Sequence, residues 1–412
     1  MGQRRGREPC HAVAMSRTND RSRLRSHLLA VLATLALVAL GCSTDDGAEG
    51  NSATTTTEAT APPENLADDP AYQGPGPYEV GLTELSLPDR EVAVFYPAAD
   101  GATDEVDDAT YSQLDALPED LAAAAPALLP EDVDTDVLTV TIDGVGVDVG
   151  ASTDGPFPLV LFSHGFGSFR LDASTLLAGI ASWGFVVAAP QHIERDRAAL
   201  VTDSVVREPA TDVQVLLDTI ELVGGADGQL EGLADTASVG AVGHSAGGRA
   251  ALTALSEPEI DVAVGWAAAG RGEVEVVEKP SMNIAAVIDV LIPLEEIEAT
   301  YEELAAPKRL VVIDGAGHNS FTDICASVRE GNDLIGLATS IGFPIPENLA
   351  AGATDGCEEG AIDTDLGWRI TQHFTVAELR HALGVDSEPV GLGPGVVDTF
   401  DAPIDYEFDL GN

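Results

Sequence analysis

The strongest indication of the fold in this sequence is the segment Val239-Gly240-Ala241-Val242-Gly243-His244-Ser245-Ala246-Gly247-Gly248. An apolar run stops at Gly243, Ser245 follows after one intervening residue, and small residues then lead into a segment that favours a helix. This is the G-x-S-x-G pattern, in which a serine sits on a strained strand-to-helix turn with its hydroxyl clear of the backbone. A Cβ at Gly243 or Gly247 would collide with a neighbouring strand or helix. The alternative is a glycine-rich helix start with Ser245 as its N-cap, and the rest of the chain decides between the two.

Short apolar runs recur along the chain and alternate with segments that favour helices. Runs of this kind are typical of strands buried on both faces of a parallel sheet. They lie at residues 157–163, 185–189, 239–242, 260–266, 283–288 and 309–313. Helices are expected at 171–183, at 210–223, after Ser245 and at 366–383. The alternation predicts an α/β fold with a mostly parallel sheet and helices on both faces.

The segments before the first buried strand predict antiparallel structure at the N-terminal edge of the sheet. Residues 78–96 alternate apolar and polar side chains around a turn and predict a hairpin. Residues 98–136 are acidic and alanine-rich, and we interpret them as a surface excursion with a weak helix. Residues 137–149 predict another strand pair, turning at Asp143-Gly144.

Residues 1–41 predict a secretory signal peptide rather than part of the fold. Arginines precede an uncharged apolar run, Leu28–Leu40, which is too short to span a bilayer comfortably. The Gly41-Cys42 pair that follows resembles a bacterial lipoprotein signal, which implies lipidation of Cys42. The alternative is an ordinary signal cleaved near Ala39. We therefore expect the protein outside the cytoplasm, lipid-anchored to the outer face of the bacterial cell membrane or secreted.

After the signal, three segments are expected: a disordered linker at 42–74, one domain at 75–384, and a tail at 385–412 that skirts the surface. The chain has 69 acidic and 20 basic residues, a net charge of −49, and many of the basic residues fall in the signal. A surface this acidic repels nucleic acid and anionic membranes. We therefore exclude nucleic acid as a partner, expect membrane contact only through the lipid anchor, and expect a monomer.

Three of the buried strands are each followed by a residue type used in nucleophilic catalysis. Ser245 follows the strand at 239–242, Asp289 follows 283–288, and His318 follows 309–313. Loops after the carboxyl ends of parallel strands meet at one edge of the sheet. A serine hydroxyl needs a base to take its proton, an imidazole serves near neutral pH, and a carboxylate fixes the tautomer of the imidazole. The sequence therefore predicts a catalytic triad of Ser245, Asp289 and His318.

Each member of this triad has an alternative interpretation when taken alone. Asp289 could be a helix N-cap, and His318 could be a loop histidine bonded to the backbone. Asp314 is a rival acid, but it lies too close to His318 in sequence to face it comfortably from a separate loop. The order of the three residues, each just past a strand, favours the triad.

The segment His164-Gly165-Phe166-Gly167 follows the strand at 157–163 and predicts an oxyanion hole. A tetrahedral intermediate carries negative charge on oxygen, and each preorganised N–H donor is worth on the order of 3 kcal/mol. The two donors are expected to be the backbone N–H groups of Ala246 and Phe166. The Phe166 ring is expected to form one wall of the substrate pocket, while His164 and His244 are expected to orient loops. No metal-ligand spacing appears in the sequence, so we expect neither a metal nor a cofactor.

These motifs together resemble the α/β-hydrolase fold. More narrowly, they resemble secreted bacterial ester hydrolases related to dienelactone hydrolase, cutinase-type polyesterase, chlorophyllase and platelet-activating-factor acetylhydrolase. The resemblance covers roughly residues 76–383. It implies cleavage of a small or polymeric carboxylic ester through an acyl-enzyme, and it implies Trp266 as a second pocket wall unless that residue is a core tryptophan. The excursion at 98–136 and Ile288, before the expected acid, depart from the usual pattern and leave the pocket shape open. A peptidase or acyltransferase of the same fold, or a non-catalytic binding lipoprotein, stays as an alternative.

The cysteine count supports the expected lipidation of Cys42. After the signal the cysteines are Cys42, Cys325 and Cys357. Export implies an oxidising compartment, so a Cys325–Cys357 disulfide is expected, with Cys42 left over to carry lipid. The disulfide would fasten the segment after His318 to the loop near Asp355 and steady the histidine.

Overall fold

The computed structural model describes residues 66–128, 135–206, 209–331, 333, 336–337 and 352–411. The expected signal peptide, Cys42 and most of the expected linker lie outside these residues. Among the described residues, no helix combines the length and apolar character needed to cross a bilayer.

Within the described residues, one eleven-stranded sheet forms the centre of the fold, in the order β11-β10-β9-β8-β7-β5-β6-β2-β1-β4-β3. The six neighbouring strands from β10 to β6 are all parallel, while β2 joins β6 in the antiparallel sense. The strands are β1 (Val80–Leu87), β2 (Arg90–Pro97), β3 (Asp108–Ser112), β4 (Thr139–Val147), β5 (Phe157–Ser163), β6 (Val186–Pro190), β7 (Ala234–His244), β8 (Val262–Trp266), β9 (Ser281–Ala286), β10 (Lys308–Ile313) and β11 (Ile404–Asp409). The predicted parallel core with an antiparallel N-terminal edge is confirmed.

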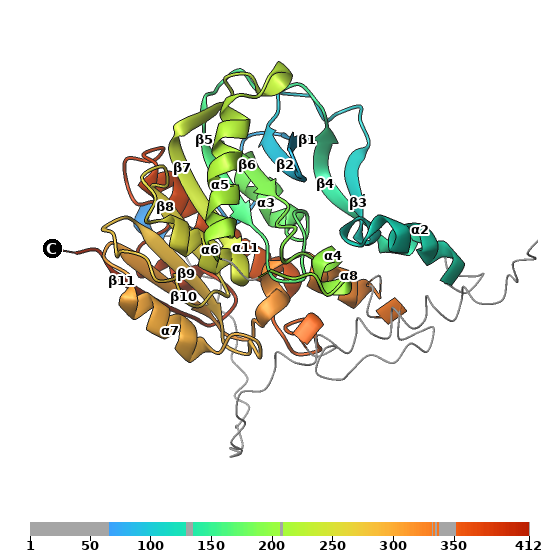
Figure 1. The fold of residues 1–412 in the computed structure, drawn as a ribbon. Helices are drawn as coiled ribbons and strands as arrows, with labels where there is room; N and C mark the ends of the chain where they lie inside the picture. The colour runs from blue at the N-terminus through green and yellow to red at the C-terminus, as the bar shows by residue number, and fades with distance from the viewer. Residues whose placement is uncertain are drawn as a thin grey trace, which may run out of the picture.

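Helices cover both faces of the sheet, as Figure 1 shows. On one face, α5 and α6 bury a cluster with alternate residues of β5 and β7, and α7 packs on β9 and β10. On the other face, α3 and α11 pack against each other and against the remaining residues of the same strands. The helices are α2 (Glu119–Leu128), α3 (Ser174–Ser182), α4 (Arg197–Val201), α5 (Pro209–Gly224), α6 (Ala246–Ala254), α7 (Leu294–Glu303), α8 (Ile324–Glu330) and α11 (Thr364–Ala382). Every central strand is therefore covered on both faces, which is why these strands are apolar throughout.

The expected C-terminal tail is part of the domain, so the prediction that residues 385–412 only skirt the surface is wrong. Val396 is fully buried and Phe400 nearly so, and β11 pairs with β10 in the antiparallel sense. The segment Ile404–Asp409 alternates apolar and acidic side chains, a pattern that suits an edge strand with one face against the protein. The preceding residues, 385–403, are rich in glycine and proline and favour a loop, and for this reason the sequence does not predict this strand.

The start of the domain and the excursion also differ from expectation. The short 3-10 helix η2 (Leu66–Asp68) already belongs to the fold, and Tyr72 is buried against Trp183, so the expected linker is too long. The expected strand pair at 137–149 is one strand, β4, with Gly144 at φ 72° within it. Its partners are β1 on one side and β3, from the expected excursion, on the other.

A buried histidine ties both ends of the domain to α11 and makes stability depend on pH. His373 accepts a hydrogen bond at Nδ1 from Tyr72 N–H (3.3 Å) and donates from Nε2 to the Gly391 carbonyl (3.0 Å). Burial lowers the pKa of His373 to about 4. The pKa of an ordinary histidine is about 6.5. Between about pH 4 and pH 6.5, His373 is therefore protonated in the unfolded chain and neutral in the folded chain. The stability from this group is complete above pH 6.5 and is lost as the pH falls toward 4.

Replacing His373 by glutamine is expected to make the free energy of unfolding depend less on pH below neutrality. From pH 7 to pH 5 the unfolding free energy of the His373→Gln variant should fall by about 2 kcal/mol less than that of the wild type, because one proton-binding site of the unfolded chain is gone. Urea unfolding of both proteins at the two pH values measures the difference. Parallel profiles would show that His373 does not titrate in this way.

Candidate active site

Ser245 lies on a strained turn between the end of β7 and the start of α6. Its backbone dihedrals are φ 56° and ψ −121°, a conformation that costs about 1–3 kcal/mol in a non-glycine residue. A Cβ added at Gly243 would lie 2.3 Å from the Gly247 carbonyl carbon, and one at Gly247 would lie 1.8 Å from the Ser163 oxygen. The Ser245 side chain makes no capping hydrogen bond. The two glycines are therefore obligatory. Ser245 does occupy the N-cap position of α6, but its side chain does not cap the helix, so capping does not account for the serine.

His318 and Asp289 form a buried pair at the carboxyl ends of β10 and β9. The imidazole Nδ1 lies 2.7 Å from Asp289 Oδ2. The other carboxylate oxygen of Asp289 accepts the backbone N–H groups of Leu291 and Ile292, each at 2.8 Å. Asp314, the rival acid, is exposed to solvent. Because Asp289 accepts at Nδ1, the neutral imidazole keeps a lone pair on Nε2 that can take a proton.

His244 joins the serine turn to the histidine loop. Its Nε2 donates to the His318 carbonyl at 2.9 Å, and the two imidazole rings lie 4.7 Å apart between centroids. The prediction that His244 orients a loop is confirmed. No hydrogen bond joins the Ser245 hydroxyl to His318 within the described part of the chain. In enzymes without substrate this bond is often long, and it tightens when substrate binds.

Asp355 is a further residue of the site that sequence reasoning missed. Its Oδ2 accepts the backbone N–H of His318 at 2.7 Å and that of Val290 at 3.2 Å, so one carboxylate ties the histidine loop to the acid loop. Two residues later, Cys357 forms the predicted disulfide with Cys325 on α8. The disulfide prediction is confirmed, and the bridge begins two residues from the carboxylate that contacts both loops. The Asp-Gly pair just before Cys357 was the available signal, because it marks a tight turn.

Removing the Asp355 carboxylate is expected to disturb catalysis more than folding. In Asp355→Ala the N–H groups of His318 and Val290 lose their acceptor, and misplacement of the imidazole should lower kcat about ten- to a hundredfold. Asp363→Ala is the matched control, because Asp363 caps α11 through Leu366 N–H (3.2 Å) and contacts neither loop. It should lower the melting temperature but keep kcat within about twofold. Equal kcat values for the two variants would remove Asp355 from the site.

The expected oxyanion loop lies against the serine turn. After β5 the chain makes a turn in which Ser168 N–H reaches the Gly165 carbonyl at 3.4 Å and Gly167 has φ 69°. A Cβ added at Gly165 would lie 3.5 Å from the Cβ of Ser245. Phe166 and Ala246 are both partly exposed. Gly165, just before one expected donor, therefore lies beside Ser245, and Ala246, the other expected donor, directly follows Ser245 in the chain.

Trp266 is not a wall of an open cleft, so that expectation is wrong. Its side chain is fully buried, packs on Phe162 with ring centroids 5.5 Å apart, and donates from the indole nitrogen to the Thr375 hydroxyl of α11 at 3.0 Å. The ring points to the face of the sheet that α11 covers. Trp266 still helps to hold the site, because its carbonyl accepts the Ser245 N–H at 2.8 Å.

Comparison with known proteins finds similarity to an acetylhydrolase family and to a solved esterase structure. A family model described as platelet-activating factor acetylhydrolase, isoform II, matches residues 70–222, which include the expected oxyanion loop and end before Ser245. Platelet-activating factor acetylhydrolase from Cavia porcellus is 32% identical over 143 residues, covering 32% of this chain and 30% of that protein. This chain therefore aligns with less than a third of the curated relative.

A solved structure supports the fold over most of the chain. The ferulic acid esterase from Streptomyces cinnamoneus matches with a TM-score of 0.57 and 20% identity, over 84% of this chain and 98% of that one. The predicted resemblance is confirmed, and the chain has the α/β-hydrolase fold.

Proposed function

We propose that the protein is a serine hydrolase that cleaves carboxylic esters through an acyl-enzyme. The observation that carries the proposal is the buried His318–Asp289 pair, 2.7 Å apart, on the loops next to a serine at positive φ. A buried imidazole bonded to a carboxylate, with a partly exposed hydroxyl on an adjacent strained turn, is the arrangement of a nucleophile and its base. The names of the two similar proteins support the class of bond, since one is an acetylhydrolase and the other an esterase.

The reaction follows from the roles of these side chains. Ser245 Oγ bonds to the ester carbonyl carbon as His318 Nε2 takes the hydroxyl proton, and the carbonyl oxygen becomes an oxyanion facing the N–H groups of Ala246 and Phe166. The tetrahedral intermediate then expels the alcohol, which receives the proton from His318. A water molecule then attacks the acyl-enzyme in the same way, with His318 taking its proton, and the carboxylic acid is released as Ser245 regains its proton. Asp289 holds the imidazole and stabilises its charged form throughout.

Hydrolysis of p-nitrophenyl acetate and butyrate tests the proposal, with Ser245→Ala as the blank. Wild-type activity that the blank lacks is the expected result. Equal rates for the two proteins would instead indicate a binding protein that has kept the fold. A peptide anilide and an added acceptor alcohol, run in parallel, separate an esterase from a peptidase or an acyltransferase, because these differ only in leaving group and acceptor.

A further inference from the structure

A buried guanidinium lies directly behind the expected oxyanion loop. Arg195, in the segment between β6 and α4, donates from Nη1 to the carbonyls of His164 and Gly165, the latter at 3.1 Å, and from Nη2 to Ser163 Oγ at 2.8 Å. Its own carbonyl accepts the N–H of Gly167 at 2.8 Å. Arg195 thus bonds to four residues in or beside the turn that carries Phe166.

The His164 side chain is a second hydrogen-bond donor to the Gly165 carbonyl. Burial keeps the pKa of His164 well below its ordinary value, so the ring is neutral. The backbone N–H of His192 donates to His164 Nε2 at 2.9 Å, which places the ring proton on Nδ1. Nδ1 lies 2.9 Å from the Gly165 oxygen and donates to it. The Gly165 carbonyl is therefore fixed by two side-chain donors, Arg195 and His164, and the prediction that His164 orients a loop is confirmed.

Fixing this carbonyl also fixes the N–H of the next residue. The peptide bond from Gly165 to Phe166 is trans and planar, so its C=O and N–H point in opposite directions. With the Gly165 oxygen turned toward Arg195 and His164, the Phe166 N–H points away from them. Gly165 itself lies beside the Cβ of Ser245.

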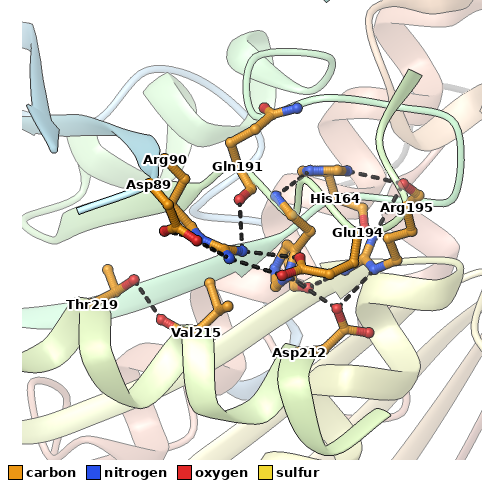
Figure 2. Close-up of polar contacts among 12 residues, drawn as sticks. Asp89, Arg90, His164, Gln191, Glu194, Arg195, Asp212, Val215 and Thr219 are labelled. Carbon is orange, nitrogen blue, oxygen red and sulfur yellow. Dashed lines mark hydrogen bonds and ion pairs between the residues drawn. The ribbon is translucent and has the colours of Figure 1, made fainter. Parts of the chain in front are cut away.

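Asp212 on α5 holds the guanidinium in this orientation (Figure 2). Its Oδ1 accepts from Arg195 Nε at 3.1 Å and lies 3.1 Å from His192 Nδ1. Burial acts to raise the pKa of Asp212, but His192 and Arg195 outweigh it, so the carboxyl stays ionised. The His192 ring closes the network, because its Nε2 lies 2.9 Å from Ser163 Oγ.

We propose that Arg195 is a positioning residue for the oxyanion hole, aiming the Phe166 N–H by holding the Gly165 carbonyl from behind. The proposal rests on the proposed esterase function and adds a part to it that does not touch substrate. The planar guanidinium of arginine has five N–H donors and can bond Asp212, Ser163 and two carbonyls at once. The ammonium of lysine, with three donors, cannot. The alternative is a buried ion pair that serves folding alone.

Arg195→Met tests the proposal, with Arg90→Met as the matched control. Arg90 is also buried and bonds to Asp89, to Glu194 and to the Gln191 carbonyl, but not to the oxyanion loop (Figure 2). Arg195→Met should lower kcat for p-nitrophenyl butyrate about 30- to 100-fold with KM within about threefold, because a misdirected donor loses most of its effect on the oxyanion. Arg90→Met should keep kcat within about threefold of the wild type.

Binding of phenylboronic acid gives a second readout that a purely structural role would not change. Boron forms a tetrahedral adduct with the serine oxygen and places a hydroxyl in the oxyanion hole, so its affinity should weaken in Arg195→Met by a factor similar to the loss in kcat. The Arg90→Met variant should bind it as the wild type does. Equal kcat and equal boronate affinity in the two variants would overturn the proposal.

Arg195→Lys keeps the proposal testable if Arg195→Met does not fold. Lysine retains the charge near Asp212 but cannot make all four bonds, so kcat should fall about five- to tenfold. An Arg195→Lys variant with wild-type kcat would overturn the proposal. The proposed esterase function is tested separately. If the wild type and Ser245→Ala hydrolyse the ester at equal rates, that function is wrong, whatever the Arg195 variants show.

Discussion

Replacing Ser245 by alanine is expected to lower kcat for p-nitrophenyl butyrate by at least about 10⁴-fold while the protein stays folded. In the proposed reaction Ser245 Oγ is the atom that bonds to the acyl carbon, so the variant should keep only the small residual rate that the proposed oxyanion donors and the substrate contacts give. Alanine fits the space, and the strained backbone at φ 56° is no worse for alanine than for serine.

The control for this variant is Ser256→Ala, just after α6, whose hydroxyl donates to the Thr253 carbonyl at 2.9 Å. It should keep kcat within about twofold, since its hydroxyl has no part in the proposed reaction. Circular dichroism of both variants checks the fold. A Ser245→Ala variant with more than a few per cent of wild-type kcat would rule out Ser245 as the nucleophile.

Asp289→Asn is expected to lower kcat by about 10⁴-fold, the second largest effect. The carboxylate accepts the Nδ1 proton of His318 at 2.7 Å. An amide that turns its NH₂ toward the ring would force the proton onto Nε2, where the base has to be free. Rotation of the amide is constrained, because the other oxygen of Asp289 already accepts the N–H groups of Leu291 and Ile292.

Asp314→Asn is the matched control, since Asp314 lies nearer to His318 in sequence but is exposed and has no contact with the ring. It should keep kcat within about threefold. Steady-state kinetics of the two variants under the same conditions decide between the acids. If Asp314→Asn lowered kcat more than Asp289→Asn, Asp314 and not Asp289 would be the acid that orients His318.

The central strands and the order of the site residues could be predicted because their signals are local. Strands buried on both faces must be apolar throughout, and the loops after parallel strands meet at one edge, so Ser245, Asp289 and His318 stand out from position alone. The glycines of the serine turn also form a local motif in the sequence, although the Cβ that Gly247 excludes would clash with Ser163 on the distant strand β5.

The parts that sequence reasoning missed depend on contacts between distant segments. Asp355 reaches His318 across the disulfide loop, and Arg195 reaches Gly165 from the segment after the next strand. The Asp355-Gly356 pair indicates only a tight turn, and no motif marks Arg195, so the sequence does not show which loop supplies each charge. Trp266 shows a different limit: its place at a strand end was correct, but the pleat turns its ring toward α11 rather than toward the serine.

Covalent trapping tests the central claim most directly. The protein is incubated with diethyl p-nitrophenyl phosphate, which transfers a diethylphosphoryl group to an activated serine, and its intact mass and peptides are then measured. The account predicts one added diethylphosphoryl group on the peptide that contains Ser245, release of one equivalent of p-nitrophenol, and no label on Ser245→Ala. A label on another residue, or an equal label on Ser245→Ala, would contradict it.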